Sequence, residues 1–204
     1  NIVVYPNPIV GITNDTICLN EYGSIKATGG TMYNWGTFGT KSTVSHNPTT
    51  NTQYDVTVTN AFKCTATGTA TIDVKPLPVY TIINDSQCMN NVATVSATGG
   101  VSYNWGVYGN STSVVTNKLI KTLSFPVVIT GANGCTVTDM ATAYMRPGPD
   151  VTITNATICV GSGAQVSASG GVQYNWGVYG NAATANLGIL TNSITIPVTV
   201  TDGL

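Results

Sequence analysis

Apolar and polar residues alternate one by one through most of this chain. In the segment 54–59 (YDVTVT), the tyrosine and both valines fall on one face, and the aspartate and threonines fall on the other. The segment 64–75 (CTATGTATIDVK) alternates in the same way. A period of two residues is typical of a β-strand with one buried face, and Thr, Val, Ile and Tyr favour strands. The pattern therefore predicts strands, and no segment has the period of a usable amphipathic helix.

Short clusters of Gly, Asn and Pro separate the alternating segments. The Asn133-Gly134 pair in GANGC (131–135) is the strongest short signal for a β-hairpin. Each stretch of about 70 residues holds about seven short strands, which is the pattern of a small antiparallel sandwich. The predicted fold is all-β: tandem small Ig-like antiparallel β-sandwiches of about seven strands each.

One aromatic phrase occurs three times, as GGTMYNWGTFGT (29–40), GGVSYNWGVYGN (99–110) and GGVQYNWGVYGN (170–181). A tryptophan within the phrase and a cysteine before it recur with the same period of about 70 residues. These landmarks are Trp35, Trp105 and Trp176, and Cys18, Cys88 and Cys159. The chain is therefore a tandem repeat.

A Pro-x-Pro segment precedes the first cysteine of each repeat, at 6–8, 76–78 and 147–149. Such a segment favours extended backbone and acts as a short, stiff linker. The predicted division is residues 1–7 as the tail strand of a preceding repeat plus linker, 8–77 as the first repeat, 78–148 as the second, and 149–204 as the third, without its last strand.

The two ends of the chain fall within repeats. NIVVYP (1–6) occupies the register of TIDVKP (71–76), and PVTVTDGL (197–204) matches the segment before GANGC, so the next cysteine is due at position 206. We expect either a window onto a longer array, or a third repeat whose final strand comes from elsewhere.

The repeated phrase places its aromatic residues in the predicted core. Tyrosine and tryptophan two apart share one face of a strand, and a buried indole supplies a large apolar area. The core residues predicted in this way are Trp35, Trp105, Trp176, Tyr33, Tyr103 and Tyr174. The alternative is an exposed aromatic platform for sugars, whose candidate contacts are Phe38, Tyr108 and Tyr179.

The chain has five cysteines. Two periodic pairings fit them: Cys18–Cys64 with Cys88–Cys135, leaving Cys159 to a partner beyond the chain end, or Cys64–Cys88 with Cys135–Cys159. The second pairing must bridge a strand, a linker and another strand, although the Cα atoms of a disulfide lie within about 7 Å. We therefore predict pairing inside each repeat. Such a bond would contribute on the order of 4 kcal/mol to a small sandwich and implies an oxidising, extracellular location.

Composition narrows the classes of function. Only 7% of residues are charged and the net charge is −1, so the chain lacks the basic footprint of a nucleic-acid-binding protein. Hydrophobic residues make up 42%, but no run approaches the roughly 18 apolar residues of a membrane span. Seven Lys and Arg residues offer few sites to trypsin-like proteases, which suits an extracellular stalk.

No constellation of catalytic or metal-binding residues stands out. His46 is the only histidine, the acidic residues are scattered, and there is no Cys-x-x-Cys pair. No glycine loop precedes a helix. We predict no catalytic residue, no metal and no cofactor.

Asn-x-Ser/Thr sequences are potential glycosylation sites. They occur at Asn14, Asn84, Asn110 and Asn155. The favoured alternative is that Asn and Ser/Thr shape a turn before the first cysteine of each repeat.

TICVGSGAQVSASGGVQYNWG (157–177), SITIPVTVTDGL (193–204) and GANGCTVT (131–138) resemble the Ig-like/PKD-like repeats of Bacteroidetes surface proteins, including gliding-motility adhesins exported by the type IX system. The first repeat departs at NAFKC (60–64), where the second has GANGC. The resemblance implies an extracellular spacer or adhesin. It also implies that Thr16, in Asp15-Thr16-Ile17, is a possible site of O-glycosylation.

These observations predict a non-enzymatic extracellular structural or adhesive segment that forms a stalk or filament on a bacterial surface. The alternatives are a filament subunit that polymerises by strand donation, and an array of carbohydrate-binding modules. The expected partners are neighbouring repeats or subunits of the same protein and surface glycans, with no nucleic acid and no direct membrane span.

Overall fold

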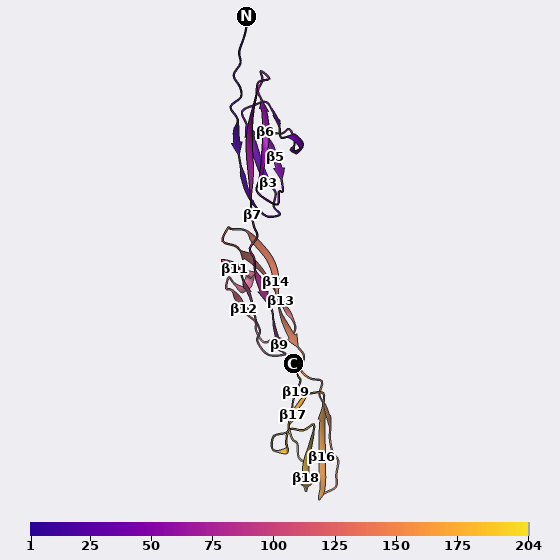
Figure 1. The fold of residues 1–204 in the computed structure, drawn as a ribbon. Helices are drawn as coiled ribbons and strands as arrows, with labels where there is room; N and C mark the ends of the chain where they lie inside the picture. Colours follow the sequence, from indigo (N-terminus) through magenta and orange to yellow (C-terminus); the bar gives the residue numbers. More distant parts are fainter. Residues whose placement is uncertain (204) are drawn as a thin grey trace. The chain divides into compact units, whose positions relative to one another are not determined.

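The computed structural model describes residues 1–203, and their regular structure consists of strands and three single 3₁₀ turns (Figure 1). The predicted all-β class of tandem small Ig-like sandwiches is confirmed. The described chain divides into two compact units, residues 1–83, 96–114 and 125–141, and residues 84–95, 115–124 and 142 onward. The dividing line crosses the second repeat, whereas each sheet stays within one repeat.

The first repeat has seven strands in two sheets. One sheet has the order β1-β3-β5, formed by Gly11–Thr13, Gly23–Thr28 and Thr43–His46. The other has the order β2-β7-β6-β4, formed by Asp15–Cys18, Thr65–Lys75, Thr52–Thr59 and Met32–Asn34.

The second repeat follows the same scheme. Its three-stranded sheet is β12-β10-β8, formed by Ser113–Val115, Thr94–Thr98 and Thr81–Ile83. Its four-stranded sheet is β11-β13-β14-β9, formed by Ser102–Asn104, Leu123–Thr130, Thr136–Arg146 and Asp85–Cys88.

The third repeat has five strands among the described residues. They form the sheets β15-β16-β18 (Thr152–Thr154, Ser162–Ser169, Thr184–Leu190) and β17-β19 (Gln173–Asn175, Thr199–Thr201). The segment 155–159, which matches β2 and β9 in sequence, forms no strand. The described residues of this repeat include no counterpart of β7 or β14, so 155–159 lacks the neighbour that β2 and β9 have.

One strand pair departs from the predicted antiparallel arrangement. β2 runs parallel to β7, with Asp15 opposite Ile72 and Cys18 opposite Lys75. β9 runs parallel to β14 in the same way, with Cys88 opposite Arg146. In both repeats, the first cysteine therefore lies at the C-terminal end of the longest strand.

The core of the first repeat lies between its two sheets. Alternate residues of β6 are buried, as the sequence pattern predicts, and they contact Ile25 and Val44 of the facing sheet and the indole of Trp35. Ile17 of β2 and Ile72 of β7 belong to the same cluster. The apolar face of the alternating pattern is therefore the face that leaves water, which is the main stabilising contribution to such a sandwich.

Candidate functional site

The repeated aromatic phrase is a structural unit. Trp35, Trp105 and Trp176 are each at most 3% exposed. The Trp35 indole Nε1–H donates to the Lys41 carbonyl at 2.9 Å, and the other two indoles make the corresponding bonds to Ser111 and Ala182. Each buried indole therefore removes a large apolar area from water, and its N–H group still has a hydrogen-bond acceptor.

The neighbours of each tryptophan explain the rest of the phrase. The Tyr33 hydroxyl donates to the Gly30 carbonyl at 2.9 Å, and the Gly36 N–H donates to Asn34 Oδ1 at 2.9 Å. Gly36 has a φ of 67°, which favours glycine, and it begins the 3₁₀ turn η1 (Gly36–Phe38). The turns η2 (Gly106–Tyr108) and η3 (Gly177–Tyr179) follow the other two tryptophans. Of the predicted core tyrosines, Tyr103 is buried, whereas Tyr33 and Tyr174 are half-buried.

The three candidate sugar contacts lie in these 3₁₀ turns. Phe38, Tyr108 and Tyr179 are 42%, 54% and 36% exposed. The Phe38 and Tyr108 rings make edge contacts with Tyr54 and Phe125, with centroids 4.9 Å apart in each pair. The Phe38 and Tyr108 rings are thus each in contact with another ring and remain partly exposed.

Two of the candidate glycosylation asparagines hold a strand in place. Asn14 Oδ1 accepts the Thr71 N–H at 2.9 Å, and Asn84 Oδ1 accepts the Thr142 N–H at 2.7 Å. These bonds join the start of β2 to β7 and of β9 to β14, so they favour a structural role for both asparagines. Asn110, Asn155 and Thr16 are exposed.

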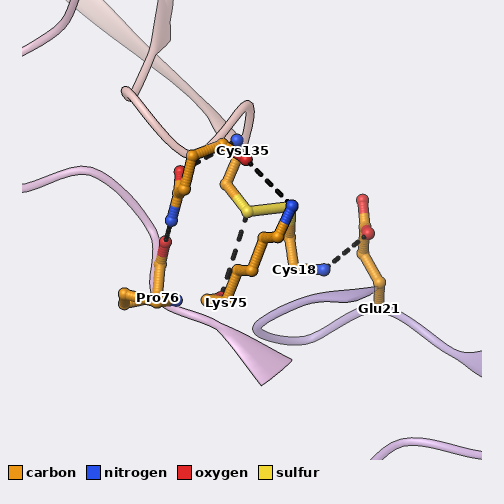
Figure 2. The surroundings of a disulfide bond; sticks show 6 residues. Cys18, Glu21, Lys75, Pro76 and Cys135 are labelled. Carbon is orange, nitrogen blue, oxygen red and sulfur yellow. Dashed lines mark hydrogen bonds between the residues drawn. A yellow bond between two sulfur atoms is a disulfide. The ribbon is translucent and has the colours of Figure 1, made fainter. Parts of the chain in front are cut away.

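The disulfide joins two repeats. Cys18 of the first repeat is bonded to Cys135 of the second, with Cα atoms 5.6 Å apart and a sequence separation of 117 (Figure 2). Among the described residues, Cys64, Cys88 and Cys159 are free. The predicted pairs Cys18–Cys64 and Cys88–Cys135 are therefore wrong, and so is the rival pairing Cys64–Cys88 with Cys135–Cys159.

The parallel pairing of β2 with β7 explains the correction. Cys64 directly precedes the 11 residues of β7, whereas Cys18 lies opposite Lys75 at the other end. At about 3.3 Å per residue, the strand separates the two cysteines by roughly 30 Å or more. The two cysteines of the first repeat therefore lie at opposite ends of it, and Cys18 lies at the end that meets the second repeat.

The chain around the disulfide is held by several hydrogen bonds. The Leu19 N–H donates to the Lys75 carbonyl at 2.9 Å, and the Cys18 N–H donates to Glu21 Oε2 at 3.0 Å. Across the junction, Asn133 Nδ2–H donates to the Pro76 carbonyl at 2.7 Å, and Lys75 Nζ donates to the Asn133 carbonyl at 3.3 Å (Figure 2). The Pro-x-Pro linker is thus bonded to the turn that carries Cys135.

A signal for this pairing was present in the sequence. Joining the first cysteine of one repeat to the second cysteine of the next is also periodic, and it leaves Cys64, Cys88 and Cys159 unpaired within 204 residues. Spacing alone does not distinguish this third pairing from the other two, because all three keep the same period.

The third repeat contains a groove of about 640 Å³ along the segment 155–160. Its lining also includes Leu187 and residues 190–194. Ile17 of β2 is 6% exposed, whereas Ile158 at the matching position is 38% exposed. In the first repeat, β7 lies between β2 and β6 in the sheet.

The described residues include no group of three or more His, Cys, Asp or Glu side chains placed to hold a metal ion. Nor does any helix in the part of the chain that the structure describes have the length and apolar character needed to cross a membrane.

No protein-family model and no curated protein matches this chain. Similar solved structures include the titin I-band fragment I67–I69, at 10% identity and a TM-score of 0.35, covering 93% of this chain and 90% of that chain. Fibronectin(III)-like modules of CbhA from Clostridium thermocellum match at 10% identity and a TM-score of 0.32, covering 68% and 95%. A Ca²⁺-stabilized adhesin that helps an Antarctic bacterium bind ice matches at 12% identity and a TM-score of 0.33, covering 83% and 60%.

Proposed function

We propose that this chain is a non-enzymatic structural segment of an extracellular bacterial surface protein, in which successive repeats form a covalently joined stalk or filament. The observation that carries the proposal is the bond between Cys18 and Cys135, which belong to different repeats. A disulfide that persists requires an oxidising compartment, which supports an extracellular location. Surface proteins of Bacteroidetes exported by the type IX system, which the repeats resemble, would provide that setting.

A bond between repeats has a mechanical consequence. The 117-residue separation between Cys18 and Cys135 contains most of the first repeat and most of the second. When the chain is pulled from its ends, force passes through the disulfide and bypasses this loop. The bonded loop therefore cannot lengthen the stalk while the disulfide is intact.

Single-molecule pulling tests this role. Reduction should free the loop and add about 400 Å to the fully extended length, at 3.3–3.6 Å per residue over the 117-residue separation. Cys88→Ser is the matched control, because Cys88 is free, and it should leave the extended length unchanged. Equal lengths with and without reductant would refute the proposal.

A further inference from the structure

Asn133 and Gly134 form the only Asn-Gly pair in the sequence. An asparagine amide is lost most readily before a glycine. The nitrogen of the next residue attacks the amide carbon, and glycine has no Cβ to hinder that attack. The pair lies in the turn that carries Cys135, which is bonded to Cys18 of the first repeat. The asparagine with the most reactive neighbour therefore lies at the junction of two repeats.

Both polar atoms of the Asn133 side chain are hydrogen-bonded. Nδ2–H donates to the Pro76 carbonyl at 2.7 Å, and Oδ1 accepts the Cys135 N–H at 3.1 Å. The attacking nitrogen is engaged as well, because the Gly134 N–H donates to the Gly131 carbonyl at 3.0 Å. Attack requires a free backbone nitrogen and an amide that can present its carbon to it, so these bonds must open first. The folded junction therefore opposes the reaction.

One of these bonds crosses the junction. Pro76 belongs to the linker that follows the first repeat, whereas the bonds to Cys135 and Gly131 lie within the turn of the second repeat. The disulfide between Cys18 and Cys135 keeps that turn beside the linker. The protection of the Asn133 amide therefore depends in part on the disulfide.

Loss of the amide would break the bond to the linker. The Nδ2 group of Asn133 is a donor, whereas both oxygens of the carboxylate that replaces it are acceptors and would meet the Pro76 carbonyl oxygen, another acceptor. The Lys75 ammonium, which donates to the Asn133 carbonyl at 3.3 Å, offers the new carboxylate a competing partner. An isoaspartate would also lengthen the main chain of the turn. Either product releases the turn from the linker.

The first repeat shows that the linker bond does not need a reactive pair. Asn60 Nδ2–H donates to the Pro6 carbonyl at 2.9 Å. Its Oδ1 accepts the N–H groups of Phe62 and Cys64, each at 3.0 Å. Asn60 is followed by Ala61, whose Cβ hinders the attack. Asn60 is therefore an internal control that has similar bonds without the reactive neighbour.

We propose that Asn133 is a self-modification site of the junction. Its deamidation is held back while the Cys18–Cys135 disulfide keeps the amide on the Pro76 carbonyl, and deamidation, once it occurs, releases the linker irreversibly. The Gly134 nitrogen gives its proton to hydroxide and attacks Asn133 Cγ, the Cγ–Nδ2 bond breaks, and ammonia leaves with a proton from water. Water then opens the succinimide to aspartate or isoaspartate. The inference rests on the junction geometry and not on the proposed stalk, so the pulling experiment can succeed or fail independently of it.

The rate of Asn133 deamidation tests the protection. The disulfide-bonded chain and its Cys18→Ser variant are incubated at mildly alkaline pH, at a temperature where circular dichroism shows both to be folded, and mass spectrometry follows each asparagine. Asn133 should react about fivefold faster in Cys18→Ser, the factor expected for the loss of one hydrogen bond. Asn60 should stay unconverted in both chains. Cys88→Ser, which removes a free thiol, should react at the parent rate. Equal rates in Cys18→Ser and the parent chain would overturn the proposal.

The rate at which dithiothreitol reduces the Cys18–Cys135 bond tests the release. Cys135 is fully buried and Cys18 is half-buried, so reduction depends on opening of the junction. Asn133→Asp, which has the side chain of one product, should therefore be reduced about fivefold faster than the parent chain, because it lacks the donor to the linker. Asn60→Asp makes the same change at the other end of the first repeat and should leave the rate unchanged. Reduction of Asn133→Asp at the parent rate would refute the release of the linker and with it the proposal.

Discussion

Cys18 lies opposite Lys75, because β2 runs parallel to the C-terminal end of β7. This pairing places Cys18 beside the linker to the second repeat. Cys135 lies there as well, directly before β14, and is bonded to Cys18. The direction of the four-residue strand β2 is therefore the reason that the disulfide joins two repeats instead of forming within one.

Loss of this bond should destabilise the joined repeats. In the loop-entropy relation, closing a loop with a separation of 117 residues contributes about 5 kcal/mol. Cys18→Ser or Cys135→Ser should therefore lower the urea midpoint of the transition that reports on the first two repeats. Cys88→Ser, which removes a free thiol, should leave that midpoint in place. A Cys18→Ser midpoint equal to that of the parent chain would show that the bond does not constrain the unfolded state.

The alternation of apolar and polar residues was enough to predict strands, a sandwich and a buried tryptophan. Those features depend on neighbours two residues apart or on a local phrase, so the sequence carries them directly. The direction of β2 was not predicted, because a strand of four residues has the same alternation whether it runs parallel or antiparallel to its neighbour. The disulfide pairing depended on that direction and was therefore wrong.

The same hydrogen bond to the linker is made by asparagines at different positions in the turns of the first and second repeats. Asn60 opens the turn of the first repeat and Asn133 is the third residue of the turn in the second, yet each donates to the linker carbonyl. Aligning the two turns by their cysteines hides this correspondence, so only the three-dimensional structure shows that both turns bind the linker.

The turn before Cys64 contains a residue with an unfavourable backbone conformation. Lys63 has a φ of 65°, whereas Gly134 takes the corresponding place in the second repeat with a φ of 85°. A non-glycine residue pays about 1–2 kcal/mol in this region. Lys63→Gly should therefore stabilise the first repeat by about 1 kcal/mol, and Gly134→Lys should destabilise the second by a similar amount. Urea denaturation measures both, and a destabilised Lys63→Gly would contradict the expectation.

The buried indole should dominate the stability of its repeat. Trp35 is 2% exposed and its Nε1–H is bonded to the Lys41 carbonyl. Trp35→Ala should reduce the free energy of unfolding by about 3–5 kcal/mol, through lost burial and a cavity. Val107→Ala is a suitable comparison, because Val107 is exposed beside the equivalent tryptophan and should change stability little. A loss below about 1 kcal/mol for Trp35→Ala would place the indole outside the core.

Asp85 should make stability depend on pH. The Thr94 N–H donates to Asp85 Oδ2 at 2.8 Å and lowers the pKa of this carboxyl, with further bonds from Gln87 and the Ser86 N–H. Because the folded pKa is depressed, the stabilisation is fully present above the ordinary aspartate pKa of about 4. It is lost as the pH falls through the folded value. Asp85→Asn should therefore lower the free energy of unfolding at pH 7 and flatten its decline below pH 4. Thermal or urea unfolding between pH 2 and 7 checks this, and parallel curves for the two proteins would exclude Asp85 as the titrating group.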